Sequence, residues 1–111
     1  GAPFQLTALD TVCDANLPDN LLQVTVYNVN RRQLAGVKII VTWESGEEQF
    51  FTGLKPELGN GYADFLMQPD VSYSVQLELG SEIATNLTSP ACRAPNGEAF
   101  NGGLKLTFQQ P

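Results

Sequence analysis

The side chains that could do chemistry in this chain are two cysteines and several groups of acidic and amide residues, because the sequence contains no histidine. Without histidine it lacks the commonest general base and the commonest ligand for transition metals. Triads that pair serine or cysteine with histidine cannot be built. Neighbouring carboxylates such as Glu47 and Glu48 lie at predicted turns, and a small domain offers no deep cleft for a glycosidase-type acid pair. We therefore expect no enzymatic activity and no cofactor.

The two cysteines, Cys13 and Cys92, lie near opposite ends of the chain. Their spacing fits neither a metal motif nor a redox motif, because both require close pairs. A structural disulfide is the preferred interpretation, and two buried free thiols are the alternative. The bond would close a loop of roughly 80 residues and contribute about 4 kcal/mol in the chain-entropy model. Because disulfides persist in oxidising surroundings, the pair predicts an extracellular or cell-surface location.

One loop is rich in oxygen ligands and is the candidate metal site. It contains Asp14, Asn16 and Asp19, which carry the hard oxygen atoms that calcium prefers. The loop lacks the glycine and the distant glutamate of an EF-hand. Turns in which these side chains bond to nearby main chain explain the residues equally well, so we do not predict a metal site there.

Aromatic rings offer a second kind of candidate site, because exposed rings can stack on sugars. Tyr27 and Tyr62 are the candidate ligand-binding residues. Tyr27 lies on the opposite strand face from Val24 and Val26, which favours exposure. Trp43 shares the phase of a buried face and is predicted to lie in the core, as in many sandwiches.

The charge of the chain limits its partners. Six Lys and Arg residues against 12 Asp and Glu residues give a net charge of -6, which disfavours nucleic acid and anionic membranes. No apolar run approaches the ~20 residues that cross a bilayer, and no signal peptide is visible. The remaining partners are neighbouring domains of a parent protein, another surface protein or a glycan.

The elements that must position these residues are strands, because apolar residues recur at every second position. The clear strands are residues 21–29, 37–44, 47–52, 61–67, 72–79 and 104–108, and weaker ones are 4–10 (an edge strand or a linker) and 82–88. The stretch 36–75 is expected to form a meander of four short strands with tight turns, and residues 11–20 and 89–103 to form loops.

No segment has a convincing helical period. The pattern therefore predicts an all-β fold: an antiparallel, immunoglobulin-like sandwich of two sheets and seven or eight strands, with a barrel as the less favoured alternative. We expect residues 1–111 to form a single domain, excised from a larger extracellular protein.

The strand pattern resembles a known family. The motifs are L-x-V-x-V at 22–26, L-x-G-V-x-I-x-V at 34–41, T-G at 52–53, G-Y-A-x-F at 61–65 and Y-x-V at 73–75. They are similar to the prealbumin-like, or carboxypeptidase-regulatory-like, domains, to which the Cna B-type modules of bacterial surface proteins are related. The chain departs from that pattern at Gly53, where an Asp often follows the Thr, and in having Trp43 and the cysteine pair.

The resemblance implies a seven-stranded sandwich that serves as an accessory module in secreted and surface proteins of bacteria. Such modules act as spacers, stalks or interaction platforms. Some carry a Lys–Asn isopeptide bond, but residues 21–29 contain no lysine and residues 104–108 no asparagine, so none is expected. We thus expect a non-enzymatic structural or interaction module. The alternative is a carbohydrate-binding accessory module of an extracellular enzyme, using Tyr27 and Tyr62.

Overall fold

The computed structural model describes residues 2–111, which form ten β-strands and no helix. The strands are β1 (Gln5–Val12), β2 (Leu21–Tyr27), β3 (Lys38–Trp43), β4 (Gly46–Phe51), β5 (Tyr62–Leu66), β6 (Tyr73–Leu77), β7 (Ala84–Leu87), β8 (Ala91–Arg93), β9 (Ala99–Asn101) and β10 (Gly103–Gln109).

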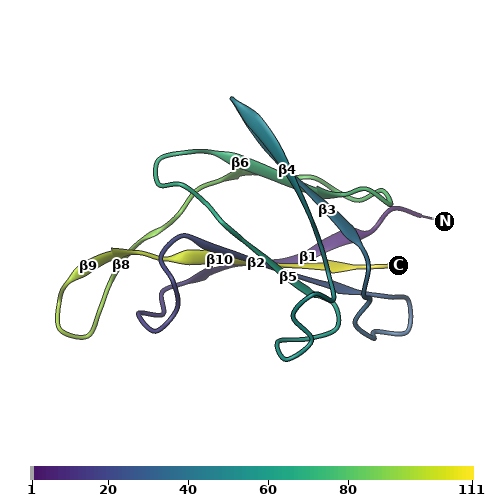
Figure 1. Cartoon of the computed structure of the whole chain (residues 1–111), viewed down its shortest axis with the longest axis horizontal. Helices are drawn as coiled ribbons and strands as arrows, with labels where there is room; N and C mark the ends of the chain where they lie inside the picture. The colour runs from purple at the N-terminus through teal and green to yellow at the C-terminus, as the bar shows by residue number, and fades with distance from the viewer. Residues whose placement is uncertain (1) are drawn as a thin grey trace.

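Eight of these strands build two sheets that lie face to face (Figure 1). The first sheet has the order β1-β10-β2-β5 and the second the order β4-β3-β6-β7, while β8 and β9 form a separate pair. Neighbouring strands are antiparallel except for β2 and β10, which run parallel. The predicted all-β, two-sheet sandwich is confirmed.

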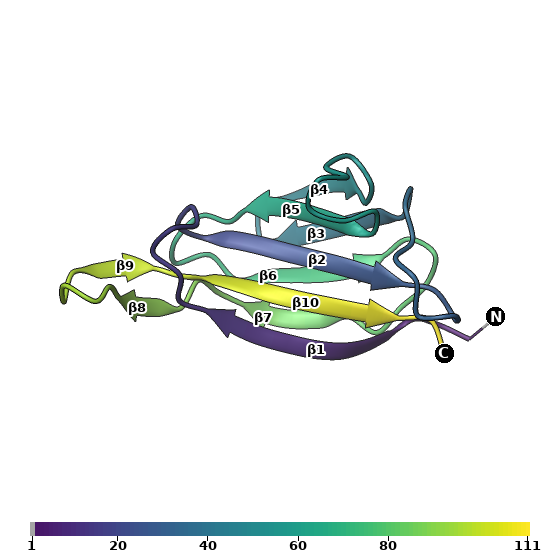
Figure 2. The ribbon, with the colours of Figure 1, turned by 90° about the horizontal axis from the view of Figure 1, so that it is seen from below.

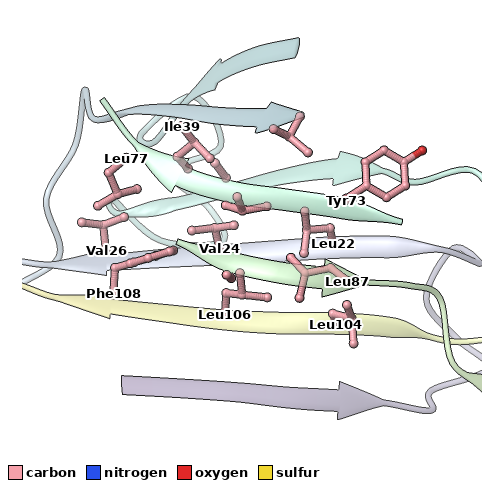
Figure 3. Packing of buried hydrophobic residues seen from close by; sticks show 14 of the residues in the cluster. Leu22, Val24, Val26, Ile39, Tyr73, Leu77, Leu87, Leu104, Leu106 and Phe108 are labelled. Carbon is pink, nitrogen blue, oxygen red and sulfur yellow. The ribbon is translucent and has the colours of Figure 1, made fainter. Parts of the chain in front are cut away.

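The core lies between the two sheets and follows the alternation in the sequence (Figure 3). Leu22, Val24 and Val26 of β2 are completely buried, as are Leu106 and Phe108 of β10. Side chains from β3, β6 and β7 cover them from the opposite sheet. Burying one such side chain stabilises the fold by about 1.5–3 kcal/mol, which makes these alternating positions the main source of stability.

The predicted four-stranded meander is wrong, because β5 belongs to the other sheet. β3 pairs with β4 and with β6, whereas β5 pairs with β2 in the first sheet. The chain therefore crosses between the layers before and after β5. Alternation shows that a strand has one buried face. Because the strands of both sheets bury that face in the same core, alternation does not show which sheet a strand joins.

Two segments that the sequence did not clearly assign to strands contain them. The segment 89–103, predicted as a loop, includes β8 and β9, which form a hairpin around the turn at Asn96 and Gly97. The segment 4–10, left open as an edge strand or a linker, is part of β1 and pairs along β10. The hairpin strands are three residues long, too short for a period of two to identify them.

The predicted disulfide is confirmed. Cys13 and Cys92 are bonded, with a sequence separation of 79 and a Cα–Cα distance of 5.6 Å. The bond fastens the segment that follows β1 to β8 at the base of the β8–β9 hairpin.

Both chain ends lie at the same end of the sandwich, and the β8–β9 hairpin projects from the other end (Figures 1 and 2). The cause is the antiparallel pairing of β1 with β10, which places Gln5 opposite Gln109. The molecule measures 46 Å along its longest axis.

Candidate functional site

The outer face of the first sheet is rimmed by three loops, formed by residues 13–20, 28–37 and 52–61 (Figure 1). Two adjoining hollows lie on this face between the loops. Both are lined by Gln23 and Tyr62 from the sheet and by Leu58 from the third loop. This face is the candidate site because it gathers strand and loop side chains into concave surfaces.

The first hollow, which we name the polar hollow, has a volume of about 340 Å³. Besides the three shared residues, it is lined by Thr25, Tyr27, Gln33, Lys105 and Thr107. Its lining combines one partly exposed aromatic ring with hydroxyl, amide and ammonium groups. Such a surface can form hydrogen bonds with a polar ligand while a ring packs against it.

The second hollow, which we name the apolar hollow, has a volume of about 330 Å³. Besides the three shared residues, it is lined by Leu17, Pro18, Leu21, Lys55, Asp64 and Leu66. Most of its exposed lining is apolar, and exposed apolar concavities of this kind mark interaction surfaces in soluble proteins.

A chain of hydrogen bonds crosses the floor of the hollows. Gln23 Nε2 donates to the Tyr62 hydroxyl (3.0 Å), which donates to Asp64 Oδ2 (2.9 Å). Lys55 Nζ donates to both carboxylate oxygens of Asp64 (2.9 and 3.0 Å). Lys55 thereby fastens the 52–61 loop to β5. Burial, followed by the neighbouring Asp64 carboxylate, raises the pKa of Tyr62 above its ordinary value of 10.0, so the phenol is neutral at physiological pH.

The structure brings the two candidate tyrosines into one hollow but exposes them differently. Tyr27 is partly buried and lines the polar hollow, as its strand phase suggests. Tyr62 is only 6% exposed, so the exposed ring expected there is not observed. Trp43, predicted as a core residue, is partly buried and packs against Phe65 and Tyr73 with ring centroids 6.1 and 5.5 Å apart. Tyr27 and Tyr62 therefore do not form a platform of two exposed rings.

The candidate calcium ligands make local bonds to main chain. Asp14 Oδ1 accepts a hydrogen bond from the Asn16 N–H (2.9 Å), which is an Asx turn. Asp19 Oδ2 accepts a long hydrogen bond from the Asn101 N–H (3.4 Å). Within residues 2–111 no three Asp, Glu or Cys side chains gather closely enough to hold a metal ion.

Sequence reasoning missed the loop residues that shape the hollows, above all Leu17 and Leu58. The available signal was the presence of leucines in segments otherwise rich in proline, glycine and polar residues. An exposed leucine in a predicted loop has no role in the core, and it can instead line a binding surface. The same loops bury Thr25 to 8% exposure although it lies on the outer face of β2.

Comparison with known protein families and with curated proteins found no match. Two solved structures resemble the chain. One is the C-terminal fragment of the pilus adhesin SpaC from Lactobacillus rhamnosus GG, with 12% identity, a TM-score of 0.48 and 85% of this chain covered. The chain spans 46% of that fragment.

The other solved structure is the dioxygenase domain of a dioxygenase carbohydrate-binding protein fusion from Streptomyces sp. SirexAA-E. It shows 14% identity and a TM-score of 0.45, with 88% of this chain and 85% of that chain covered. Similarities this weak support no inference about function. Within residues 2–111 no helix is long and apolar enough to cross a membrane.

Proposed function

We propose that this chain is a non-enzymatic interaction module of a secreted or cell-surface bacterial protein, and that its partners bind the outer face of the first sheet. The motifs between residues 22 and 75, which resemble prealbumin-like accessory modules, support this role. The Cys13–Cys92 disulfide supports a location outside the cytoplasm, where such bonds persist.

The observation that carries the proposal is the position of the two chain ends. Gln5 lies opposite Gln109, so any polypeptide attached to Ala2 and to Pro111 would leave from one end of the sandwich. A spacer or stalk module adds length by having its two attachment points at opposite ends. The same-end arrangement instead favours a platform that presents its faces and its far end to partners.

The side chains of the candidate site are better suited to binding than to catalysis. The chain has no histidine, and the two ionisable groups at the centre of the site, Tyr62 and Asp64, bond to each other. Lys55 Nζ also donates to both carboxylate oxygens of Asp64, so neither oxygen is left without a partner.

The test is to immobilise the oxidised chain and challenge it with a display library of extended peptides and with a glycan array. We expect a retained ligand whose binding is weakened by Leu58→Asp and unchanged by Gln49→Ala, an exposed position on β4 of the other sheet. Absence of any ligand from both collections would contradict the platform role. Turnover of ester, glycoside or peptide substrates that disappears in Asp64→Asn would contradict the non-enzymatic assignment.

A second candidate function is carbohydrate binding, favoured by the polar hollow. Tyr27 there lies beside Gln33, Lys105 and Thr107, a mixture of one ring and several hydrogen-bonding groups. Sugar recognition uses such mixtures, because a ring packs against the sugar face while polar groups bond its hydroxyls. Specific retention on a glycan array that is lost in Tyr27→Ala and kept in Gln49→Ala would support it, and silence across the array would oppose it.

A further inference from the structure

The edge of β5 leaves main-chain groups free. Along an antiparallel pair of strands, every second pair of opposite residues is joined by main-chain hydrogen bonds. Between β2 and β5 one bonded pair is Val26 and Gly61, where the Val26 N–H donates to the Gly61 carbonyl (2.9 Å). Continuing that alternation, Ala63 and Phe65 direct their main-chain groups to β2, whereas Asp64 and Leu66 direct theirs away from the sheet. The next outward group along the strand, the Tyr62 carbonyl, already accepts from the Gly53 N–H (3.2 Å). The free part of the edge is therefore residues 64–66.

Each of the other three edge strands of the two four-stranded sheets has a feature that discourages pairing. The start of β1 is closed by bonds from Phe4 and Leu6 to residues 80–82, and a bulge follows at residues 6–8. β4 has a regular register, but its exposed residues Glu47, Glu48 and Gln49 are polar and offer an added apolar segment little to pack against. β7 has an irregular register with β6 and a left-handed residue, Asn86 (φ 55°). Bulges and broken registers discourage strand addition, and β5 has an unbroken register.

Apolar side chains surround this free edge. Four of the large hydrophobic residues that are exposed lie on or beside it: Phe51 (41% exposed), Leu54 (76%), Leu58 (57%) and Leu66 (61%). The apolar hollow lies on the outer side of β5. A smaller cleft of about 100 Å³ lies between β5, Phe50 and Phe51 of β4, and Leu54. A strand laid along β5 would thus meet apolar surface on both of its faces.

Charge around the edge favours a basic partner. Glu57 lies in the flanking loop, and Glu47 and Glu48 lie on β4, which contacts β5. The one lysine at the edge, Lys55, is already paired with Asp64. The net charge of -6 attracts cations and makes a second copy of this chain a poor partner, because the two copies repel each other.

From these observations we infer that β5 receives, by strand addition, an extended segment of another protein in which apolar and basic residues alternate. Main-chain bonds to Asp64 and Leu66 supply affinity. Because alternate side chains of a strand project from opposite faces, the apolar residues of the segment enter the apolar hollow, and its basic residues project on the side of β4, which carries Glu47 and Glu48. The inference rests on the proposed interaction role and names the class of partner for it. The Lys55 side chain lines both the apolar hollow and the smaller cleft and is paired with Asp64, so it has to move toward solvent when the segment binds along β5.

The experiment uses a short synthetic peptide in which valine and lysine alternate, titrated into the isotopically labelled, oxidised chain and followed by NMR. We expect the largest shifts and the strongest slowing of amide exchange at Asp64 and Leu66. We expect Leu66→Lys to weaken binding by roughly tenfold or more, since it removes an apolar contact and repels the basic peptide. Leu9→Lys on β1, where Leu9 is 52% exposed, is the matched control and should bind like the parent.

Control peptides test the mode of binding. Only every second N–H of a strand faces its neighbour, so one peptide is N-methylated at all valines and another at all lysines; the one with its facing N–H groups blocked should bind at least about tenfold more weakly. A valine–glutamate peptide carries the wrong charge and should also bind at least about tenfold more weakly. No binding of the valine–lysine peptide, shifts confined to β1 or β4, or dimerisation of the chain through β5 would overturn the inference. Binding of other ligands in the polar hollow in that case would leave the proposed function standing.

Discussion

Thr52 is the buried polar residue that holds two of the three rim loops together. It is 1% exposed; its hydroxyl donates to the Leu34 carbonyl (2.7 Å) and accepts from the Val37 N–H (3.0 Å). Thr52→Val keeps the shape but leaves both groups unpaired, so we expect the free energy of unfolding to fall by about 1–3 kcal/mol in urea titrations. Thr85→Val, at an exposed position on β7, is the control. Equal stability of the two variants would show that Thr52 does not tie the loops.

Tyr62 gives a prediction about alkaline pH. Burial raises its pKa above the ordinary value of 10.0, so the folded chain keeps the phenol proton at pH values where the unfolded chain has lost it. Stability should therefore be independent of this group below pH 10 and should decrease as the pH rises through the folded pKa.

The check is the pH dependence of urea unfolding. Tyr62→Phe should make the alkaline decrease in stability shallower than in the parent chain. An identical slope in the two proteins would show that the pKa of Tyr62 is the same in the folded and unfolded chains.

The disulfide gives the largest expected effect of any single bond. It closes a loop across 79 residues, and the chain-entropy model assigns such a bond about 4 kcal/mol. Cys13→Ser with Cys92→Ser should therefore lower the free energy of unfolding by about this amount. A reducing agent should lower the stability of the parent to that of the double variant and leave the double variant unchanged. Equal stability of the oxidised and reduced parent would contradict the structural role of the bond.

The sequence predicts the environment of a residue well only where that environment does not depend on segments far away in the chain. Cys13 and Cys92 were paired correctly from the sequence because the chain has no other cysteine. The burial of Thr52 and Tyr62 could not be predicted, because loops and strands far away in sequence cover them. Tyr27 was placed on the correct face because strand phase alone decides it.

At the scale of elements, β10 is the central test of the core. It lies between β1 and β2, and Leu106 at its middle is completely buried. Leu106→Ala should lower the free energy of unfolding by about 2–5 kcal/mol in urea titrations, because it removes buried methyl groups and leaves a cavity. Lys105→Ala, on the outer face of the same strand, should change it little. Similar losses at both positions would contradict the assignment of faces.

The sequence predicts the strands and their buried faces better than their partners. In the predicted strand 104–108 the period of two puts Leu104, Leu106 and Phe108 on one face, and all three are buried. The parallel pairing of β10 with β2 and the crossing of β5 to the first sheet leave no local trace in the sequence. The free edge of β5 and the hollows beside it depend on that crossing, so they could not be predicted either.

At the scale of the whole molecule, the position of the ends separates a platform from a spacer. β1 starts where β10 finishes, and the disulfide-fastened β8–β9 hairpin marks the far end of a body 46 Å long. A force that pulls the two chain ends apart would act first on the hydrogen bonds between β1 and β10, and it would not be transmitted along the length of the sandwich. This geometry supports the presentation of a face to partners and opposes a role as a linear connector.

The most direct test of this account is the distance between spin labels at Ala2 and Pro111, attached without using thiols so that the disulfide stays intact. A second pair at Ala2 and Asn96, in the turn of the β8–β9 hairpin, provides the reference for the length of the molecule. The account predicts that the first distance is much shorter than the second. Two similar, long distances would place the ends at opposite sides of the molecule and would contradict the proposed platform.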